Sequence, residues 1–496
     1  MTISLSKSKI LASLQCPKRV WLEVHRKDLR VDSSLAQAAF DTGNKVGAVA
    51  RMIYDPKKTG VLIEIDKLGF QAAFEKTATL LKTKQPIFEA GFRTRHALAF
   101  ADVMLPVYGG WRMVEVKASS EVTDVHRDDI AVQAWVARQA GVKLKNASLA
   151  IIDKQWIYTK TDNYLGLFKE EDFTDEVDER ENEVADWVAQ AQKTIAKKKE
   201  PARSTGGHCL KPYKCGFLPY CQSQEPKIRF PITLIPNANT KALKSHLARD
   251  DVKSLRDVPD DLLTPIQLRV KTQSLKGKEY LDAKGAKAAL APYKGTLLFL
   301  DFETAMFAVP EWLGATPYDQ VPFQFSLHIL QPNGKLTHTG YLDLSGKDPR
   351  QAFAKALIKE CAEPGPIFVY NKTMEATRVK ELAAIFPQMS TKLLAIEKRM
   401  VDLWPIAKTH YYHPDMEGSW NLKGLLEAIA PELNYDNLDG VKNGGMAMEA
   451  YVIATNPNTS QEDRDRIGRE LKLYCERDTL AMVKVWQKFA GRRTQP

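Results

Sequence analysis

The residues with the clearest chemical potential lie in the stretch from Phe100 to Lys117, FADVMLPVYGGWRMVEVK. Apolar and polar residues alternate on both sides of a glycine pair, which predicts two strands joined by a tight turn. A turn centred just before the first glycine sets Asp102 opposite Glu115, close enough for the two carboxylates to share a cation. Glu115 and Lys117 are two residues apart, so their side chains point to the same face of the strand.

Such a group of charges is typical of a metal site. Two acids and one ammonium that converge on one strand face are costly unless a metal ion lies between them. Oxygen ligands and a partly open coordination shell favour Mg²⁺ or Mn²⁺. Glu89, in PIFEAGF just before the hairpin, is either a further metal ligand or a strand-end glutamate that faces water. The residues alone also permit an exposed hairpin with ordinary surface charges.

The same residues carry a family resemblance. Asp102 followed by Glu115-Val116-Lys117 resembles the core motif of the PD-(D/E)XK nuclease superfamily, in its RecB-like branch. The resemblance implies that the acids hold the metal, and that Lys117 positions the attacking water and stabilises the developing charge. Gln133, near the start of an expected helix, matches a glutamine of that family. The tyrosine that the family carries four residues later is absent, because Ala137 occupies its position.

Three cysteines within thirteen residues, together with one distant cysteine, indicate a second kind of site. Disulfides are rare in cytosolic chains, where compact cysteine clusters usually bind metal. Four thiolates hold either Zn²⁺ or a [4Fe–4S] cluster, and spacing alone does not choose. The arrangement resembles the iron–sulfur clasp of RecB-like nucleases, which favours a cluster that ties the first helix to the end of the domain. The C-x5-C-x5-C spacing departs from the C-x2-C pair of several relatives and leaves zinc open. The four residues are Cys16, Cys209, Cys215 and Cys221, whereas Cys361 and Cys475 are expected to be free thiols.

A second group of acids lies in the C-terminal half. GTLLFLDFETA, from Gly295 to Ala305, is an apolar run that is consistent with a buried strand. Asp301 and Glu303 face one way at the end of this run, where sites of α/β sheets usually lie. Near the C-terminus, ELKLYCERDTLAMVKVW predicts an amphipathic helix with Tyr474 and Asp478 on one face.

These two motifs resemble the first and last motifs of DEDDy 3′–5′ exonucleases, which have an RNase H-like fold. The resemblance implies a further acid from a helix, and Glu375 stands where the family usually carries aspartate. The acids would hold two cations, and Tyr474 would orient the attacking water. Asp402 either supports this site or caps the next helix. The region from about Tyr293 onward also resembles a domain of unknown function found fused behind RecB-like nuclease domains.

The elements that must position these residues predict an α/β protein. We expect a helix from Leu5 to Asp28 that is interrupted at Cys16-Pro17, a helix from about Val125 to Ala140, and a strand in NASLAIID. The resemblances imply a restriction-endonuclease-like domain and an RNase H-like domain joined by a small helical connector. The expected bounds are residues 1–222, 223–292 and 293–496.

Composition limits the class of protein. At 496 residues the chain is long enough for two or three domains, and 44% apolar with 27% charged residues is typical of a soluble globular protein. No apolar run could cross a membrane and the N-terminus is too polar for a secretory signal, so we expect a cytoplasmic protein without a membrane partner. A net charge of +10 favours a polyanionic partner.

Together these patterns predict a metal-dependent DNA nuclease with two active sites. The alternatives are an RNA exonuclease and a catalytically decayed scaffold that binds nucleic acid. Tyr411, Tyr412 and Trp420, in HYYHPDMEGSW, either stack on unpaired bases or pack on their own domain.

Overall fold

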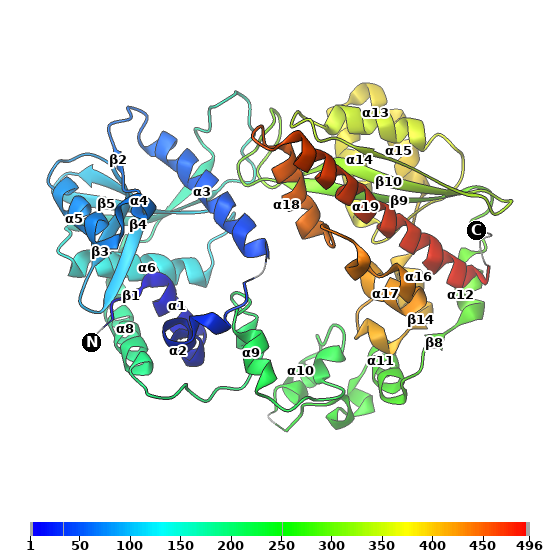
Figure 1. The fold of residues 1–496 in the computed structure, drawn as a ribbon, viewed down its shortest axis with the longest axis horizontal. Coiled ribbons are helices and arrows are strands. Elements are labelled where there is room, and N and C mark those ends of the chain that lie inside the picture. Colours follow the sequence, from blue (N-terminus) through cyan, green and yellow to red (C-terminus); the bar gives the residue numbers. More distant parts are fainter. Residues whose placement is uncertain (1–2, 33, 250, 493–496) are drawn as a thin grey trace. The chain divides into compact units, whose positions relative to one another are not determined.

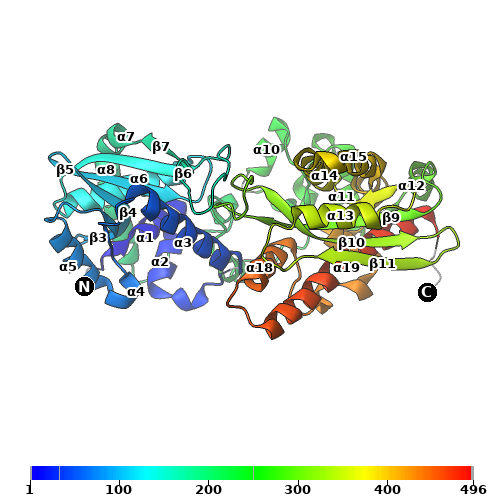
Figure 2. The same cartoon turned by 90° about the horizontal axis from the view of Figure 1, so that it is seen from above.

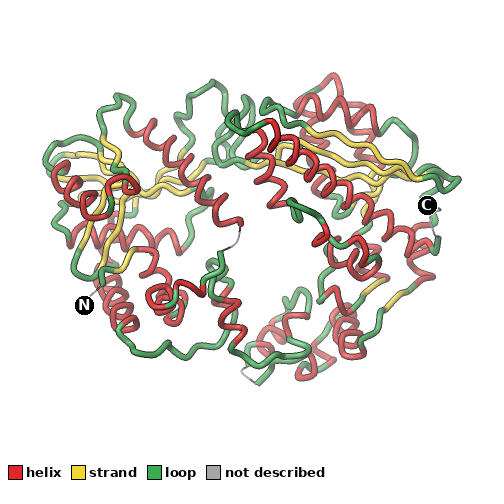
Figure 3. The backbone as a smooth tube through the Cα atoms, in the orientation of Figure 1, coloured by secondary structure: helices red, strands yellow, loops and turns green. Residues whose placement is uncertain are grey.

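The structure is a computed structural model of the chain, and it describes residues 3–32, 34–249 and 251–492. The chain folds as two compact units, Met1–Pro226 with Phe307–Asp319 and Lys227–Met306 with Gln320–Pro496. Each unit combines helices with a central sheet, which confirms the predicted mixed α/β class (Figure 1, Figure 3). Most of the predicted connector, residues 227–292, folds with the second unit.

The sheet of the first unit has the strand order β2-β3-β4-β5-β6-β7, with β1 paired to β4. Neighbours from β3 to β5 are antiparallel, whereas β5 and β6 are parallel. Val107 pairs with Gly110 and the pairing continues to Val103 and Val114, so the predicted hairpin and its register are confirmed. The strands are β1 (Leu5–Ser6), β2 (Val61–Leu62), β3 (Ile87–Arg93), β4 (Ala97–Val107), β5 (Gly110–Lys117), β6 (Leu144–Ile152) and β7 (Phe168–Asp172).

Helices cover both faces of this sheet. The predicted break at Cys16 is confirmed, because Pro17 is the first residue of a new helix, a position that needs no backbone donor. Side chains of α1, α6 and α8 share one apolar core with the sheet, and α3 lies in a separate cluster with β6. The helices are α1 (Lys7–Gln15), α2 (Pro17–His25), α3 (Ser34–Tyr54), α4 (Ile65–Leu68), α5 (Phe70–Leu80), α6 (Asp124–Gln139), α7 (Thr174–Glu179), α8 (Glu181–Ile195) and α9 (Leu218–Ser223).

The inward and outward alternation of β3 and β4 breaks where the first candidate site lies. Ile87 and Ala90, three residues apart, share one core cluster, although strict alternation would put them on opposite faces. Glu89 lies between them with a φ of 55°, a left-handed conformation that is rare for a residue with a long side chain. The pairs on either side of it place Glu89 opposite Asp102. Strained backbone of this kind is often found at functional sites.

The sheet of the second unit has the strand order β11-β10-β9-β12-β13. Strand β10 is antiparallel to both β9 and β11, and β9, β12 and β13 are parallel. The predicted strand from Gly295 to Ala305 is therefore the central strand, β9. The strands are β9 (Leu297–Met306), β10 (Gln320–Leu330), β11 (Leu336–Leu342), β12 (Ile367–Val369) and β13 (Met400–Asp402), and β8 (Tyr280–Leu281) pairs separately with β14 (Tyr411–Tyr412).

Two layers of helices enclose this sheet, as Figure 2 shows for α13 to α15 and for α19. Leu298 and Leu300 belong to the core under α13, α14 and α15, whereas Leu297 and Phe299 belong to the core under α19. This alternation makes β9 buried on both faces. The helices are α10 (Lys241–Leu247), α11 (Pro265–Lys276), α12 (Ala283–Leu290), α13 (Arg350–Glu360), α14 (Thr373–Ile385), α15 (Ser390–Arg399), α16 (Trp404–His410), α17 (Leu422–Ile429), α18 (Gly444–Thr455) and α19 (Gln461–Ala490).

Within the described ranges, no helix combines the length and the apolar character that a bilayer crossing requires.

Candidate functional site

The predicted acids and lysine of the first unit do meet on one face of β5. The Lys117 ammonium donates to Glu115 Oε1 at 2.6 Å, and Asp102 Oδ2 accepts from the backbone N–H of Val116 at 2.7 Å. Burial raises the pKa of Asp102 well above its usual value, and the charge of Glu115 raises it further. The two carboxyl groups therefore repel each other in the metal-free protein, as the ligands of a shared cation should.

Two residues that the sequence did not single out complete this group. Lys7, at the start of α1, contacts Glu115 Oε1 at 3.1 Å and Asp129 Oδ1 at 2.8 Å. Asp129, on α6, is also paired with Lys117. Burial opposes the charge of Lys117, but Glu115 and Asp129 outweigh it and raise its pKa well above the usual value. Asp129 is one helical turn before Gln133, and this spacing could have pointed to Asp129 as a further residue of the site. No pattern in the sequence pointed to Lys7.

Polar atoms without partners mark the same region. Among the described residues, Glu115 Oε2 and both polar atoms of the fully buried Gln133 amide have no hydrogen-bond partner. Buried polar atoms are nearly always paired, so such exceptions point to a ligand that the chain itself does not supply. Glu89 is half-buried, and burial and then Glu115 raise its pKa, so it belongs to the same cluster of charges.

The charges of this group leave room for a cation. When ionised, Glu89, Asp102, Glu115 and Asp129 carry four negative charges against the two positive charges of Lys7 and Lys117. The formal charge is −2, which one divalent ion would neutralise. Carboxylate oxygens are the donors that Mg²⁺ and Mn²⁺ prefer, so the donor set fits these ions.

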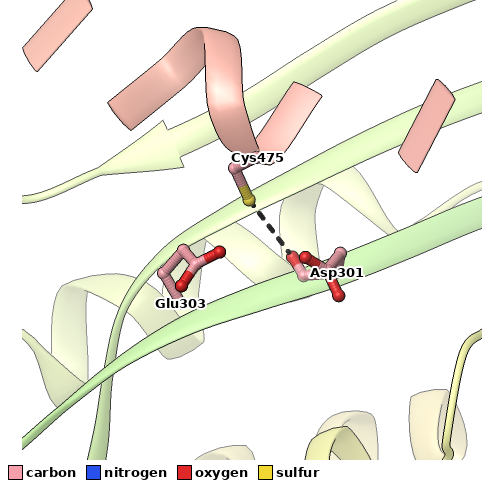
Figure 4. Close-up of side chains that lie close together, drawn as sticks. All are labelled: Asp301, Glu303 and Cys475. Carbon is pink, nitrogen blue, oxygen red and sulfur yellow. Dashed lines mark hydrogen bonds between the residues drawn. The ribbon is translucent and has the colours of Figure 1, made fainter. Parts of the chain in front are cut away.

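The predicted acids of the second unit also come together. Asp301 and Glu303 lie on β9 with Cys475 of α19, and one ligand atom of each lies within 4.8 Å of the other two (Figure 4). Burial and then Asp478 and Glu375 raise the pKa of both Asp301 and Glu303 well above their usual values. All four predicted acids therefore act on one another across a small buried region.

Several features of this group fit divalent cations. Glu303, Glu375 and Asp478 are each more than nine-tenths buried, and Glu375 Oε2 has no hydrogen-bond partner among the described residues. No lysine or arginine of the described ranges forms an ion pair with any of the four acids. Their formal charge of −4, when ionised, would be neutralised by two divalent ions.

Tyrosines and a thiol complete the second group. The hydroxyl of Tyr435 donates to Asp478 Oδ1 at 2.5 Å, and its ring lies 5.9 Å from the ring of Tyr474. Cys475 was predicted to be a free thiol; it is free, but its Sγ lies 3.9 Å from the carbonyl oxygen of Asp301. Burial and then Asp301 raise the pKa of Cys475 well above its usual value, so the thiol is protonated at neutral pH. Nothing in the sequence pointed to Tyr435.

The sequence allowed two roles for Asp402, to support the second site or to cap the next helix. Its hydrogen bonds show that it caps this helix. Its Oδ1 accepts from the N–H of Trp404 at 2.9 Å, at the start of α16, and from the N–H of Asn371 at 3.0 Å. Its Oδ2 accepts from the N–H of Lys372 at 3.1 Å. Asp402 thereby holds both the turn before α14, which carries Glu375, and the start of the next helix.

The raised pKa values predict how pH and metal change stability. Burial raises the pKa of Glu375 to about 8 and that of Asp478 to about 7, so the folded state binds these protons more tightly than the unfolded state. In EDTA, the free energy of unfolding should therefore fall as the pH rises from about 4 to about 8. Divalent ions need the ionised acids, so the stabilisation by Mn²⁺ should grow over the same range.

Thermal unfolding between pH 5 and pH 8, with EDTA and with Mn²⁺, measures both trends. Replacing Glu375 by Gln should flatten the EDTA curve, whereas replacing the exposed Asp465 of α19 by Asn should leave it unchanged. Equal stabilisation by Mn²⁺ at every pH would contradict the assignment of these acids as ligands.

The four predicted cysteines line one cavity of the first unit. It lies between the α1–α2 junction, the 3₁₀ turn Gly207–Cys209 and α9, and its volume is only about 20 Å³. Burial, together with the other cysteines of the cavity, raises the pKa of Cys221 to about 11, although Lys18 acts in the opposite direction. Gln15 donates to the carbonyl oxygens of His208 and Tyr213, which ties α1 to the cysteine-bearing loop. All cysteines of the described residues are free thiols.

The spacing of these sulfurs bears on which group they would hold. Among the described residues, no three of them lie within 4.8 Å of one another. A tetrahedral zinc with Zn–S bonds of about 2.3 Å would bring all four within about 3.8 Å. A cluster whose own iron atoms bind the sulfurs holds them further apart. The present donor set fits either group, and zinc would have to draw the sulfurs closer together.

The aromatic residues considered for base stacking are mostly part of the core. Tyr411 and Tyr412 are fully buried where β14 pairs with β8, and Trp420 is 4% exposed. The two tyrosines are therefore unavailable for stacking, because both rings are buried in the apolar core of the second unit.

Comparisons with known proteins bear on part of the second unit. Residues 298–421 match the family described as "Domain of unknown function (DUF2779)", which agrees with the resemblance expected from about Tyr293 onward. "Uncharacterized protein UU173" of Ureaplasma parvum is 25% identical over 217 residues, 39% of this chain and 31% of that protein. "Uncharacterized protein MG366" of Mycoplasma genitalium is 23% identical over 208 residues, 38% of this chain and 31% of that protein. The chain thus spans about a third of the length of these curated relatives, and no solved structure matches it.

Proposed function

We propose that the protein is a metal-dependent nuclease that hydrolyses phosphodiester bonds of DNA at two sites, one in each unit. The observation that carries the proposal is that two sets of acids, distant in the sequence, converge in buried positions with uncompensated charge. Buried acids whose charge exceeds that of their cationic partners, as in the first unit, or that have no ion pair, as in the second, are expensive, and divalent ions bound between them and a phosphate would remove that cost. The basic net charge of the chain agrees with a polyanionic substrate.

In the first unit, Asp102 and Glu115 would hold the ion, with Glu89 as a further oxygen ligand. Lys117 stands on the same strand face and would hold a water and stabilise negative charge on the phosphate. Lys7 and Asp129 would position Lys117, because both contact the network of acids that surrounds its ammonium. The strand order, with β5 and β6 parallel across α6, is compatible with the restriction-endonuclease-like fold that the motif resemblance implies.

In the second unit, Asp301, Glu303, Glu375 and Asp478 would hold two ions, and Tyr474 would orient the attacking water. Bound Mg²⁺ or Mn²⁺ supplies a nucleophile at neutral pH and stabilises the leaving oxygen. Tyr435 holds Asp478 in place by its hydrogen bond. The strand order β11-β10-β9-β12-β13, with only the second strand from one edge antiparallel, supports the RNase H-like fold and thus removal of nucleotides from 3′ ends.

The test is digestion of 5′-labelled single-stranded DNA by the full chain, with Mg²⁺, with Mn²⁺ and with EDTA. Metal-dependent shortening supports the proposal, and a matched RNA strand separates a DNA nuclease from an RNA exonuclease. Tight binding without turnover in either metal would instead favour a nucleic-acid-binding scaffold, for which Ala137 and Glu375 depart from the family patterns.

We also propose that Cys16, Cys209, Cys215 and Cys221 hold a [4Fe–4S] cluster with a structural role. The resemblance of the four-cysteine arrangement to the iron–sulfur clasp of RecB-like nucleases supports the cluster over zinc. Protein purified without oxygen should be brown and contain about four iron atoms per chain. Cys221→Ser should lower the iron content and the melting temperature, whereas Cys361→Ser should change neither the colour nor the iron content. A colourless wild-type protein with one zinc per chain would overturn the assignment.

A further inference from the structure

An open pocket lies in the second unit beyond the ends of β12 and β13. Its volume is about 500 Å³, within the size range of sites for small ligands. We call it the tryptophan pocket, and the residues that matter for its chemistry are Tyr370, Asn371, Trp404, Lys408, Trp420 and Asn421. The acids of the proposed active site are not among the residues that line this pocket.

The walls of this pocket are fixed by hydrogen bonds. Asp402 Oδ1 accepts from the backbone N–H of both Asn371 and Trp404, so one carboxylate holds two opposite segments of the lining. The Tyr370 hydroxyl donates to the carbonyl oxygen of Trp420 at 2.5 Å. Asn371 has a φ of 67°, a strained conformation of the kind often found where a backbone segment serves a ligand. The pocket is thus formed before any ligand arrives, which lowers the entropic cost of binding.

The chemistry of the lining suits a nucleotide. Trp404 is half-buried, with the Lys408 ammonium 4.4 Å from its ring centroid. Lys408 forms no ion pair within the described ranges, so no carboxylate neutralises its charge, but its ammonium covers one face of the Trp404 ring. A base that stacks on this face would displace the ammonium, which could then reach the phosphate of the same nucleotide. The side chain of Asn371 is exposed and has no hydrogen bond of its own to other described residues. An aromatic face, an ammonium without an acidic partner and an amide together can bind the ring, the phosphate and an edge of one nucleotide.

The position of the pocket connects it with the acids of β9. Strand β12 is parallel to β9 and next to it, with Ile367 paired to Leu298, so both strands end at the same edge of the sheet. Asn371 lines the pocket and lies two residues before the start of α14, which carries Glu375 in its first turn. Asp402, which holds the pocket wall at Asn371, also accepts from the N–H of Lys372, the residue directly before α14.

We propose that the tryptophan pocket binds an unpaired base and its phosphate in a single strand of nucleic acid whose 3′ end lies at the acids of the second unit. The inference rests on the proposed function for the direction of the strand, but binding in the pocket does not depend on catalysis. A polymer is favoured over a free nucleotide because the pocket is open and adjoins the acids, so a strand can run from one to the other. Trp404 provides the stacking surface, and Lys408 provides the phosphate contact.

The experiment uses the full chain in EDTA, where metal-dependent hydrolysis cannot occur, with fluorescein-labelled deoxythymidine dodecamer as probe. Fluorescence anisotropy gives the dissociation constant for wild type, Trp404→Ala, Trp404→Phe, Lys408→Ala and the exposed control Lys335→Ala. Trp404→Ala should bind about 10-fold more weakly or worse, and Trp404→Phe should stay close to wild type. Lys408→Ala should lower the salt slope of binding by about one, and Lys335→Ala should change nothing.

Crosslinking shows where the strand lies. A dodecamer with 4-thiothymidine near its 3′ end should crosslink to residues 404–408 or 418–422 in wild type, and the adduct should disappear in Trp404→Ala. Unchanged binding by Trp404→Ala, crosslinks confined to other segments, or competition by thymidine monophosphate as strong as by the dodecamer would each overturn the inference. Thermal unfolding verifies that Trp404→Ala is folded. If digestion with Mn²⁺ fails but binding depends on Trp404, the proposed function falls and the pocket stands.

Discussion

Replacing Asp301 by Asn should reduce removal of nucleotides from 3′ ends by at least about 100-fold. A ligand atom of Asp301 lies within 4.8 Å of those of Glu303 and Cys475, so its carboxylate would be a direct ligand of the proposed ions. Substitution of a residue that hydrogen-bonds a metal ligand typically lowers metal affinity or activity about 10- to 100-fold, and loss of a direct ligand should lower activity more. The assay follows a 5′-labelled single strand in Mn²⁺, in a Lys117→Ala background that removes the contribution of the first site.

The same substitution should not harm the metal-free fold. Burial and the charges of Asp478, Glu375 and Glu303 raise the pKa of Asp301, so asparagine removes a repulsive charge without changing the shape of the side chain. In EDTA the melting temperature should stay the same or rise, whereas the stabilisation by Mn²⁺ should shrink. Asp465→Asn, an exposed substitution on α19, is the matched control for both measurements. Activity equal to that of the control would show that the acids of β9 are not the catalytic group.

Local patterns predicted the parts of both sites that single elements build. The register of β4 and β5 follows from a glycine turn and from alternation, so Asp102 opposite Glu115 could be predicted. The spacing of Asp301 and Glu303 follows from one strand, and that of Tyr474 and Asp478 from one helix. In each case a regular element turns a distance along the sequence into a direction in space.

Residues that reach the sites through tertiary packing could not be predicted. Lys7 meets Glu115 because α1 packs against the face of the sheet that carries it, and no periodic pattern links residues so far apart. Cys475 has no other cysteine near it in the sequence, and only the packing of α19 against β9 brings it beside Asp301. Tyr411 and Tyr412 stand among polar neighbours, but pairing with β8 buries them. The bend at Glu89 breaks the alternation on which strand prediction depends.

Replacing Lys117 by Ala should abolish cleavage by the first unit, with a loss of about 1,000-fold or more. Its ammonium is the cationic group on the strand face that carries Glu115, where negative charge would develop on the phosphate. Removal also leaves Glu115 and Asp129 with Lys7 but without Lys117, so the metal-free variant should lose about 3–5 kcal/mol of unfolding free energy, the typical cost of breaking a buried ion pair. Cleavage is measured in an Asp301→Asn background, which removes the contribution of the second site. Circular single-stranded DNA reports internal cuts by the first site, and linear strands report cuts from the ends.

Lys7→Ala separates catalysis from charge balance. It removes one positive charge from the same acids, since Lys7 contacts Glu115 and Asp129 as Lys117 does, and it should destabilise the metal-free protein to a similar extent. Both variants make the formal charge of the group more negative, from −2 to −3, so Mg²⁺ should stabilise each of them more than wild type. Cleavage by Lys7→Ala should fall by only about 10- to 100-fold, because Lys7 acts by positioning Lys117 and the acids. Equal losses of cleavage in the two variants would show that charge balance alone, and not the place of Lys117 on β5, sets the activity.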